Sequence, residues 1–351
     1  KQIPGIGNIL YRRLLQTFKT PEAAFNATEA ALISVEGIST GLAKKIHSFS
    51  DFDTVDRDLE KADKSDTSIL TFNDSDYPSL LATIDDPPPF LYVKGSWNGD
   101  LHYPIAVVGS RKTTTYGRSV TERLCRSLSE NGMIIISGFA RGIDSHAHRA
   151  ALTAGGRTIA VLGCGIDVCY PVENKKLFHE ILEQGAIISE FPMDALPEPH
   201  HFPQRNRIIS GLSLGCVVIE SGLRSGSLIT ARLALEQGRE VFAVPGSIFS
   251  DHSAGPHHLI ASGAKLVRGV EDILEEILPQ VRQWTLFSES KKPDLEEDEE
   301  KIFSLLSFDP KHVDLVISES TMPTSVVSNL LLMLELKGFI RQQAGQYYVR
   351  T

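Results

Sequence analysis

The sequence predicts an α/β protein whose core is a doubly wound, mostly parallel sheet, flanked by a helical domain and a winged-helix domain. Between residues 104 and 268, apolar runs of strand length alternate with segments of helix length. The runs are nearly continuous in apolar residues, which is typical of strands covered by helices on both faces. We expect strands at IAVV (105–108), MIIIS (133–137), TIAVL (158–162), AIIS (186–189), CVVIE (216–220), EVFAV (240–244) and AKLV (264–267).

Length and composition bound the domain count and the cellular setting. A chain of 351 residues suggests two or three domains, and an apolar fraction of 42% is enough for real cores. No run reaches the roughly 18 to 20 apolar residues of a spanning helix, so no membrane segment is expected. The four cysteines show neither Cys-x-x-Cys pairs nor a disulfide spacing. They predict reduced thiols in a cytoplasmic protein, without a metal centre.

Residues 1–62 are expected to form a helical domain of the helix-hairpin-helix, or SAM-like, type. The phrases IPGIGNILYRRLLQTF from Ile3 and VEGISTGLAKKIHSF from Val35 each place a glycine turn before a helical pattern with a basic pair. Such turns can offer backbone N–H groups to a phosphate. The segment is acidic as a whole, so the alternative, a helical bundle whose glycines only cap helices, stays open.

Residues 63–280 are expected to hold the sheet domain. The segment begins with a short strand pattern, SILTF, and a proline-rich extended stretch, YPSLLATIDDPPPFLYVKG. Three consecutive prolines at 87–89 exclude a helix there. This stretch therefore predicts an extension of one edge of the main sheet.

Residues 281–300 are predicted to be an acidic linker and residues 301–351 a winged helix. The run 294–300 holds six acids in seven residues and indicates a solvated segment. Beyond it, two or three helical patterns end at Gly338, and the strands FIRQQ and QYYVR follow with a turn at Ala344-Gly345. The candidate recognition helix, TSVVSNLLLMLELK, carries one Lys and one Glu, which favours protein contact over duplex binding.

The net charge of −9 is unevenly distributed along the chain. Residues 1–100 carry 10 Lys/Arg and 15 Asp/Glu, residues 101–270 carry 17 and 14, and residues 271–351 carry 8 and 15. Only the middle segment is basic. An anionic ligand is therefore best sought on the sheet domain.

Small and basic residues follow almost every predicted strand. In an open parallel sheet, ligands bind beyond the carboxyl ends of the strands, and small residues let a backbone approach closely. These ends are Gly109-Ser110-Arg111, Ser137-Gly138 with Arg141-Gly142, Gly163-Cys164-Gly165, Ser189-Glu190, Glu220 with LRSGSLIT (223–230), and Pro245-Gly246-Ser247. Arginines stand nearby at 111, 141, 205, 207 and 224. The pattern favours an anion with several separated phosphates, because a guanidinium donates two bonds at once.

Two catalytic patterns are weaker than they look. Ser137, Asp144 and His148 are the residue types of a triad, but they lack the Gly-x-Ser-x-Gly elbow that exposes a nucleophile. His146 and His148 lie two apart on an expected helix and so point to different faces. The pairs His200-His201 and His257-His258 are read as packing or phosphate-facing residues rather than metal ligands.

Five motifs in order resemble the DprA (Smf) family, the bacterial DNA-processing proteins of natural transformation. They are GSRKTTTYG, SGFARGIDSHAHRAAL, TIAVLGCGIDVCYPVENKKL, SEFPMDALPEPHHFPQRNRIISGLS and ESGLRSGSLITARLALEQGREVFAVPG, densely covering residues 70–268. Ser221, where the family often has Ala, and the 255–258 loop are departures, and the second leaves that loop's contacts open. The resemblance implies an extended Rossmann-like domain and no enzymatic activity or cofactor.

The resemblance also implies a function and a set of contacts. Proteins of this family bind single-stranded DNA, protect it and load the RecA recombinase onto it, as homodimers built through the Rossmann-like domain. By motif, Ser110 and Arg111 would clamp a phosphate. The further contacts that the motifs imply are Gly138, Gly163, Gly165, Ser225, Gly226, Ser227, Lys175 or Lys176, and Arg205, Asn206 and Arg207. The strand-end pattern adds Gly109, Arg141, Gly142 and Thr230 as candidate contacts. Tyr116, Phe139, Tyr170 and Phe202 are the candidates for base stacking.

Two other classes remain as alternatives. A nucleotide phosphoribohydrolase of the lysine-decarboxylase-like type shares this Rossmann variant, but its Pro-Gly-Gly-x-Gly-Thr loop is replaced here by LRSGSLIT. A purely structural oligomer would show no affinity for DNA. A titration with single-stranded and duplex DNA at two salt concentrations separates these classes.

Overall fold

The computed structural model describes residues 3–97, 99, 101–278, 297–306, 311–320, 322–337, 339–343 and 345–350. The chain divides into two compact units, Lys1–Pro279 and Gln280–Thr351, which are described separately. No helix in these described ranges has the length and apolar character needed to cross a membrane.

The first unit is organised around a sheet in which nine strands of the described residues pair in the order β1-β2-β6-β5-β4-β3-β7-β8-β9. The strands are β1 (Ser68–Thr71), β2 (Phe90–Gly95), β3 (Pro104–Val108), β4 (Ile134–Ser137), β5 (Thr158–Leu162), β6 (Ala186–Ser189), β7 (Gly215–Val218), β8 (Glu240–Ala243) and β9 (Lys265–Leu266). All neighbours from β6 to β9 are parallel, whereas β2 is antiparallel to both β1 and β6. The expected parallel sheet is confirmed, and the proline-rich stretch leads into its antiparallel edge.

The strand order reverses between β3 and β7. From β3 the chain winds outward through β4, β5 and β6, and from β7 it winds the other way through β8 and β9. The two central strands are parallel, with Val108 opposite Val218, so both end at the same edge. A crevice forms at such a switch point because the following loops turn away to opposite sides. Gly109-Ser110 and Ile219-Glu220 begin these two loops.

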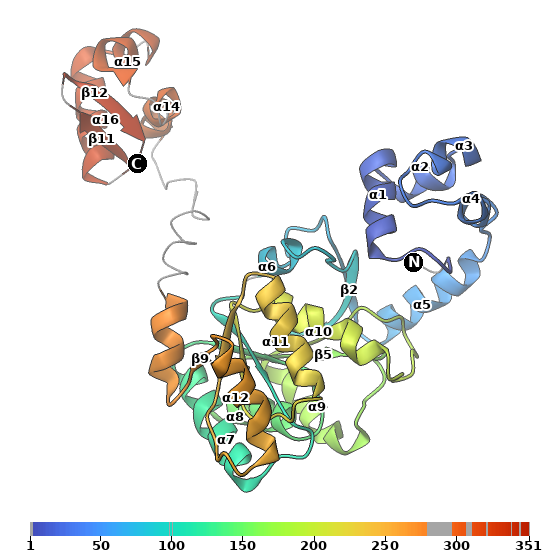
Figure 1. The fold of residues 1–351 in the computed structure, drawn as a ribbon. Coiled ribbons are helices and arrows are strands. Elements are labelled where there is room, and N and C mark those ends of the chain that lie inside the picture. The colour runs from blue at the N-terminus through green and yellow to red at the C-terminus, as the bar shows by residue number, and fades with distance from the viewer. Residues whose placement is uncertain are drawn as a thin grey trace. The chain divides into compact units, whose positions relative to one another are not determined.

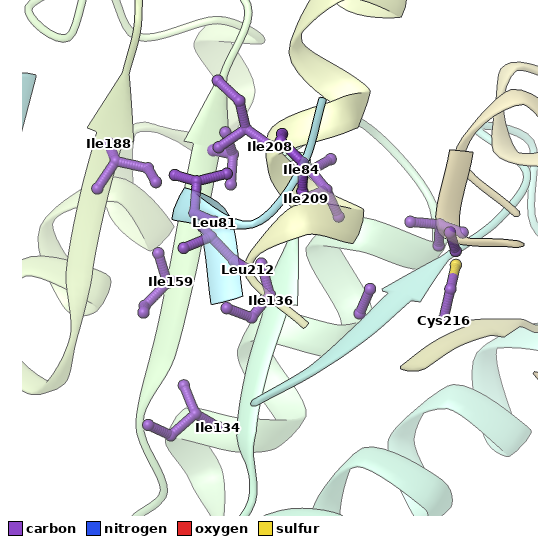
Figure 2. Packing of buried hydrophobic residues seen from close by; sticks show 14 of the residues in the cluster. Leu81, Ile84, Ile134, Ile136, Ile159, Ile188, Ile208, Ile209, Leu212 and Cys216 are labelled. Atoms are coloured by element: carbon purple, nitrogen blue, oxygen red, sulfur yellow. The ribbon is translucent and has the colours of Figure 1, made fainter. Parts of the chain in front are cut away.

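Helices cover both faces of the sheet (Figure 1). Alternate residues of each strand pack in opposite directions, as the pleat requires. Ile136 and Ile188 pack with Leu81, Ile208 and Leu212 on one face (Figure 2). On the other face lie Leu162, Ile187, Phe178 and Ile181. The helices are α6 (Ser79–Ala82), α7 (Thr115–Glu130), α8 (Ile143–Thr153), α9 (Lys175–Gln184), α10 (His201–Gly211), α11 (Gly226–Glu236), α12 (Ala254–Ala261) and a helix over 270–278, with short 3-10 turns η1 (Val172–Asn174) and η2 (Asp251–Ser253).

The N-terminal part of this unit is helical, as expected. It contains α1 (Asn8–Phe18), α2 (Pro21–Phe25), α3 (Glu29–Ile33), α4 (Thr40–His47) and α5 (Phe52–Lys64). Gly5 and Gly37, the glycines of the two repeated phrases, have φ of +106° and +91°, which favours glycine before α1 and α4. Helix α5 continues across the boundary predicted at residue 62, toward β1.

The second unit is a winged helix with its own core. It comprises α14 (Glu297–Leu305), β10 (Lys311–His312), α15 (Val313–Ser320), α16 (Thr324–Leu336), β11 (Ile340–Gln343) and β12 (Tyr347–Arg350). The three strands pair antiparallel, with β12 between β10 and β11, and Val327, Leu331 and Ile340 lie in the core. Gly338 and Ala344, predicted as helix stop and turn, lie outside the described residues.

One expectation for the acidic run is wrong. Residues 281–296 of the predicted linker lie outside the described ranges, but Glu297–Glu300 forms the first turn of α14. Glu299 is only 5% exposed, and its carboxylate accepts hydrogen bonds from Lys337 Nζ at 2.7 and 2.6 Å. A partner 38 residues further along the chain therefore stabilises part of this run in a helix.

Candidate nucleic-acid interface

A cavity of about 600 Å³ lies at the carboxyl edge of β3 and β7, where the strand order reverses. Its wall includes loops that follow β3, β4, β7 and β8 and the first turns of α10 and α11. The lining residues are Val108, Gly109, Ser110, Arg111, Lys112, Ala140, Asp144, Pro199, Phe202, Pro203, Arg205, Asn206, Ile209, Gly222, Arg224, Ser225, Gly226, Ser227, Thr230, Asp251 and His252. Many of the predicted contacts thus share one cavity.

The Gly109-Ser110-Arg111 turn is held on both sides by backbone bonds. Ser110 N–H donates to the Glu220 carbonyl at 2.7 Å, and Ile143 N–H donates to the Ser110 carbonyl at 3.1 Å. A Cβ at Gly109 would lie 2.6 Å from Ile143 Cγ1, so α8 and the turn can meet only because residue 109 is glycine. Gly142, with φ of +77°, would place a Cβ against the Ser110 carbonyl. Both glycines therefore fix the turn from which Arg111 projects.

Arg111 is exposed beside an aromatic ring at the cavity. Its guanidinium lies 5.3 Å from the centroid of the Phe202 ring, within the range of a cation–π contact. Among the described residues Arg111 makes no ion pair, so its fork of N–H donors faces solvent at the rim. A guanidinium held in this way can bind a phosphate without first breaking a salt bridge.

Arg205 lines the cavity but is almost wholly buried. It is 4% exposed, and Nη1 donates to the carbonyls of Gly138, at 2.7 Å, and of Val161. Burial lowers the pKa of Arg205 to about 10, and the nearby Asp144 opposes that shift. The expected direct contact at this residue is therefore not what its geometry favours, since Nη1 is bonded to the ends of β4 and β5 and Nε donates to Asn206 Oδ1 at 3.3 Å.

Asp144 completes this buried arrangement. Its Oδ2 accepts hydrogen bonds from Gly138 N–H at 3.1 Å and Ala140 N–H at 3.3 Å. Burial raises the pKa of its carboxyl, and the Arg205 charge counteracts the rise. A Cβ at Gly138 would lie 2.7 Å from both Arg205 Nη2 and Asp144 Oδ2. Gly138 therefore leaves room for both side chains beneath the loop.

Arg207 and Asn206 are also buried, at 8% exposure each. Arg207 pairs with Glu190 at 2.8 Å and with Asp86 at 2.9 Å. Asn206 Nδ2 donates to the Gly226 carbonyl at 3.4 Å, which supports the first turn of α11. Because their polar groups are engaged with the protein, these two residues position the loops around the cavity, in contrast to the direct contacts expected from the motif.

The first turn of α11 contributes hydroxyls and backbone N–H groups. Ser225 caps the helix by accepting from Ser227 N–H at 3.3 Å, and Ser227 Oγ donates to Ser221 Oγ at 3.0 Å. Thr230 Oγ1 lies one turn further along, 3.5 Å from the Gly226 carbonyl. Gly226 is exposed, and a Cβ there would meet nothing within 4 Å. An anion can therefore approach this helix end closely.

A smaller adjoining cavity continues past Phe202. Arg111 and Phe202 line both cavities, and Gly138, Arg141, Gly163 and Tyr170 also line the smaller one. The Tyr170 ring lies 5.8 Å from that of Phe202, and a Cβ at Gly163 would lie 2.9 Å from Phe202 Cδ1. Gly163 therefore lets Phe202 lie flat against the end of β5. Gly165 is buried in the loop that follows β5, where its N–H donates to the Ala195 carbonyl at 2.8 Å.

Three predicted basic contacts differ in their placement. Arg141 lines the smaller cavity but forms an ion pair with Glu173. Lys176 pairs with Glu180 at 3.3 Å and lines a separate groove with Arg149 of α8. Lys175 is exposed at the start of α9. Of the three, only Arg141 is among the residues that line either cavity.

The four aromatic residues that are candidates for base stacking differ in their position relative to the cavities. Phe202 and Tyr170 lie at the cavities, whereas Phe139 is fully buried against Phe178 and cannot stack on a base. Tyr116 donates its hydroxyl to the Pro245 carbonyl at 2.6 Å and lines a groove beside α7. Phe139 follows β4, where the ligand was expected, but its ring packs in the core against His148 and Phe178.

Ser137 and Asp144 of the rejected triad share a side-chain hydrogen bond, whereas His148 binds a different partner. Ser137 donates to the Val107 carbonyl at 2.6 Å, and His148 Nδ1 lies 2.7 Å from Thr158 Oγ1. Burial lowers the pKa of His148 to about 3, so this histidine is neutral. His148 is therefore not positioned to act as a base toward Ser137.

One group of residues in the described chain could hold a metal ion. Ligand atoms of Glu198, His200 and His201 lie within 4.8 Å of one another. Glu198 and His200 form an ion-pair contact at 3.3 Å, and the His201 ring lies 4.0 Å from that of Phe191. The packing expected for His201 is present, and two of the three ligands are exposed.

Sequence reasoning missed several cavity residues. The anchoring role of Glu220, a residue named above at a strand end, was also missed: its carboxylate accepts from Thr114 N–H at 2.9 Å and from the Thr113 and Thr114 hydroxyls, which holds the start of α7. Lys112, Pro199, Asp251 and His252 line the cavity without having been singled out. Lys112 could have been predicted from its position beside Arg111. The sequence gives no such indication for Asp251 and His252, because only the fold brings their loop to β7.

The fold and crevice define a class of protein: a Rossmann-like domain with a cationic, small-residue crevice at its switch point, joined in one chain to a winged helix. Residues 68–278 match the family model of DNA recombination-mediator protein A, and residues 288–346 match that of the DprA winged helix domain. The chain therefore belongs to the DprA/Smf family, as its motifs predicted.

Relatives and solved structures agree with this assignment. Protein Smf of Synechocystis is 35% identical, over 99% of this chain and 96% of its own length. The X-ray structure of DprA from Streptococcus pneumoniae superposes with a TM-score of 0.70 at 38% identity, covering 79% of this chain and 95% of that one. DprA from Helicobacter pylori, described for its single-stranded DNA binding mode, has a TM-score of 0.55 at 31% identity, covering 61% and 96%.

Proposed function

We propose that this protein binds single-stranded DNA in the cavity at the switch point. The observation that carries the proposal is the exposed Arg111 guanidinium beside the Phe202 ring, at the rim of a cavity lined by glycine and serine loops. A phosphate can bind the guanidinium while a neighbouring base lies against an aromatic ring. The Helicobacter pylori relative is described as a single-stranded DNA binder, which supports the same function here.

A single strand fits this site better than a duplex or one small cofactor. Its phosphates are spaced along a flexible backbone, and the two adjoining cavities share Arg111 and Phe202 as neighbouring binding points. We propose direct contacts from Ser110, Arg111, Ser225 and Gly226, with Arg141 and Gly163 further along the strand. Arg205, Asn206 and Arg207 hold these loops in place from below.

The biological role that we propose is protection of incoming single-stranded DNA and loading of RecA onto it in the cytoplasm, during transformation or homologous recombination. The protein would act as a homodimer through its Rossmann-like domain and without catalysis. Family membership supports these assignments. Measuring RecA filament formation on DNA covered by a single-strand-binding protein tests the loading role directly, and no acceleration by this protein would contradict it.

The site is tested by fluorescence anisotropy with a labelled oligo-dT and its duplex of equal length at two salt concentrations. The proposal requires preference for the single strand and a steep loss of affinity with salt. Equal affinity for both forms, or none for either, would contradict it. Release of adenine from AMP would instead favour the phosphoribohydrolase alternative.

A further inference from the structure

The most exposed large apolar side chain in the described part of the chain stands beside the candidate DNA cavity. Phe249 is 93% exposed, and its neighbour Ile248 is 81% exposed. Both lie in the loop between β8 and η2. An aromatic ring this exposed contributes nothing to the core, and an exposed apolar patch is typical of a binding site.

The loop tip is a defined turn. Ser250 N–H donates to the Ser247 carbonyl at 3.1 Å, and Phe249 N–H donates to Ser247 Oγ at 3.3 Å. Ile248 and Phe249 therefore occupy the two central positions of a β-turn. His257 Nε2 lies 3.1 Å from the Gly246 carbonyl and fixes the beginning of the loop.

The other side of the loop is joined to the cavity. Ser221 N–H donates to the His252 carbonyl at 2.7 Å, and Gly255 N–H donates to the Ser221 carbonyl at 2.8 Å. The carbonyl of the preceding residue, Glu220, accepts the hydrogen bond from Ser110 N–H that holds the Gly109-Ser110-Arg111 turn. A short series of backbone bonds thus connects the loop to the Arg111 turn.

Phe249 also lies close enough to the cavity to reach a DNA strand that is bound there. Asp251 and His252 line that cavity, and two residues of chain, at most about 7 Å, separate Phe249 from Asp251. Phe202 lies against the end of β5, with Arg111 at 5.3 Å and Arg205 at 6.0 Å from its ring centroid. Phe249, in contrast, offers an almost uncovered ring on the β7–β8 side of the cavity.

We propose that Phe249 is a base-stacking residue, which receives a nucleobase of a single strand whose phosphates lie at Arg111 and the first turn of α11. This inference rests on the proposed single-stranded DNA function. A base has an apolar face of the size of the phenyl ring, and stacking tolerates any base, as a non-specific binder requires. The ring supplies the contact that phosphate-binding groups cannot.

The test compares Phe249→Leu with wild type, using a labelled oligo-dT and a sugar-phosphate strand of the same length that lacks bases. Leucine keeps the apolar volume and removes the ring. We expect Phe249→Leu to weaken oligo-dT binding between about fivefold and a hundredfold, and to leave binding of the abasic strand within about twofold. Phe249→Trp should restore oligo-dT binding. Leu59→Ala on α5, which removes another exposed apolar side chain, is the matched control and should change neither affinity.

Three results would overturn the stacking role. These are unchanged oligo-dT affinity in Phe249→Leu, an equal loss on both strands, and a loss of self-association by sedimentation velocity, which would assign the ring to contact with a second copy. Failure of the wild-type protein to bind oligo-dT would instead contradict the proposed function itself, so the two failures are distinguishable.

Discussion

The Arg111 guanidinium lies 5.3 Å from the centroid of the Phe202 ring, although the two residues are 91 positions apart in the sequence. Arg111 follows the central strand β3, and Phe202 lies in the first turn of α10. The contact holds a charged group over an aromatic one at the rim of the cavity. Nearby, the buried side chains of Arg205 and Arg207 bond to the protein. The exposed guanidinium of Arg111 is available for a ligand.

Gly226→Asp tests whether the first turn of α11 receives a phosphate. A Cβ there has nothing within 4 Å, and an acid at the first position of a helix is compatible with the helix dipole, so the fold should tolerate it. The added negative charge should weaken single-stranded DNA binding at least tenfold in an anisotropy titration. Gly226→Ala is the control and should bind within about threefold of wild type. Normal binding by the aspartate variant would remove α11 from the DNA path.

Arg205→Met tests whether this arginine is structural. The substitution leaves Asp144 buried without its opposing charge, which should cost about 3 to 5 kcal/mol of unfolding free energy at pH 7, measured with urea. Asp144 already has a raised pKa, and without Arg205 it should rise further. The deficit relative to wild type should therefore shrink as the pH falls toward about 4.5, because the carboxyl becomes protonated in the folded variant.

A second substitution tests whether Asp144 causes the pH dependence of that loss in stability. In an Asp144→Asn background, Arg205→Met should cost the same at both pH values. A pH-independent deficit in the natural background would show that Asp144 is not the group left unpaired.

His148→Gln tests the buried neutral histidine. Its folded pKa, about 3, lies below the unfolded value of about 6.5, so the unfolded chain binds protons more tightly. Stability is complete above about pH 6.5 and decreases as the pH falls toward 3. Between pH 7 and pH 5 the wild type should lose about 2 kcal/mol more than the glutamine variant in urea titrations. The exposed His258→Gln is the control, and an equal pH slope in all three proteins would contradict the assignment.

Removal of residues 294–351 tests the role of the winged helix. Its candidate recognition helix α16 exposes Leu332 and Met333 rather than a basic surface, and Lys337 is paired with the buried Glu299. We therefore expect affinity for single-stranded DNA to stay within about threefold, or about 0.6 kcal/mol. A hundredfold loss by anisotropy would show that this domain contributes to DNA binding.

Much of the first unit could be predicted because its strands are buried on both faces. The apolar runs coincide with β3 to β9 to within about two residues at most ends, and the switch point places the loops that were singled out at one edge. Motif and position also singled out Arg111 and Ser225, and the structure places both in the lining of the cavity. The strand positions are local properties of the sequence, and the position of the loops follows directly from the strand order.

The depth of individual side chains could not be predicted in the same way. Arg205 and Arg207 were expected as contacts from their motif, and Phe139 as a stacking candidate near the end of β4, yet each is buried. Arg207, for example, pairs with Asp86, 121 positions away. Likewise, the composition of the acidic run gave no indication that Lys337 would hold Glu299 in α14. Such contacts depend on the completed fold rather than on local pattern.

The most direct test of the central claim is the salt dependence of single-stranded DNA binding by Arg111→Ala. Arg126→Ala, which removes an exposed charge from the far end of α7, is the matched control because it changes the net charge equally. Arg111→Ala should weaken binding by about 1 to 3 kcal/mol and lower the slope of log affinity against log salt by about one phosphate, whereas the control should keep the wild-type slope. An affinity and slope unchanged from wild type in Arg111→Ala would contradict the phosphate clamp and the account built on it.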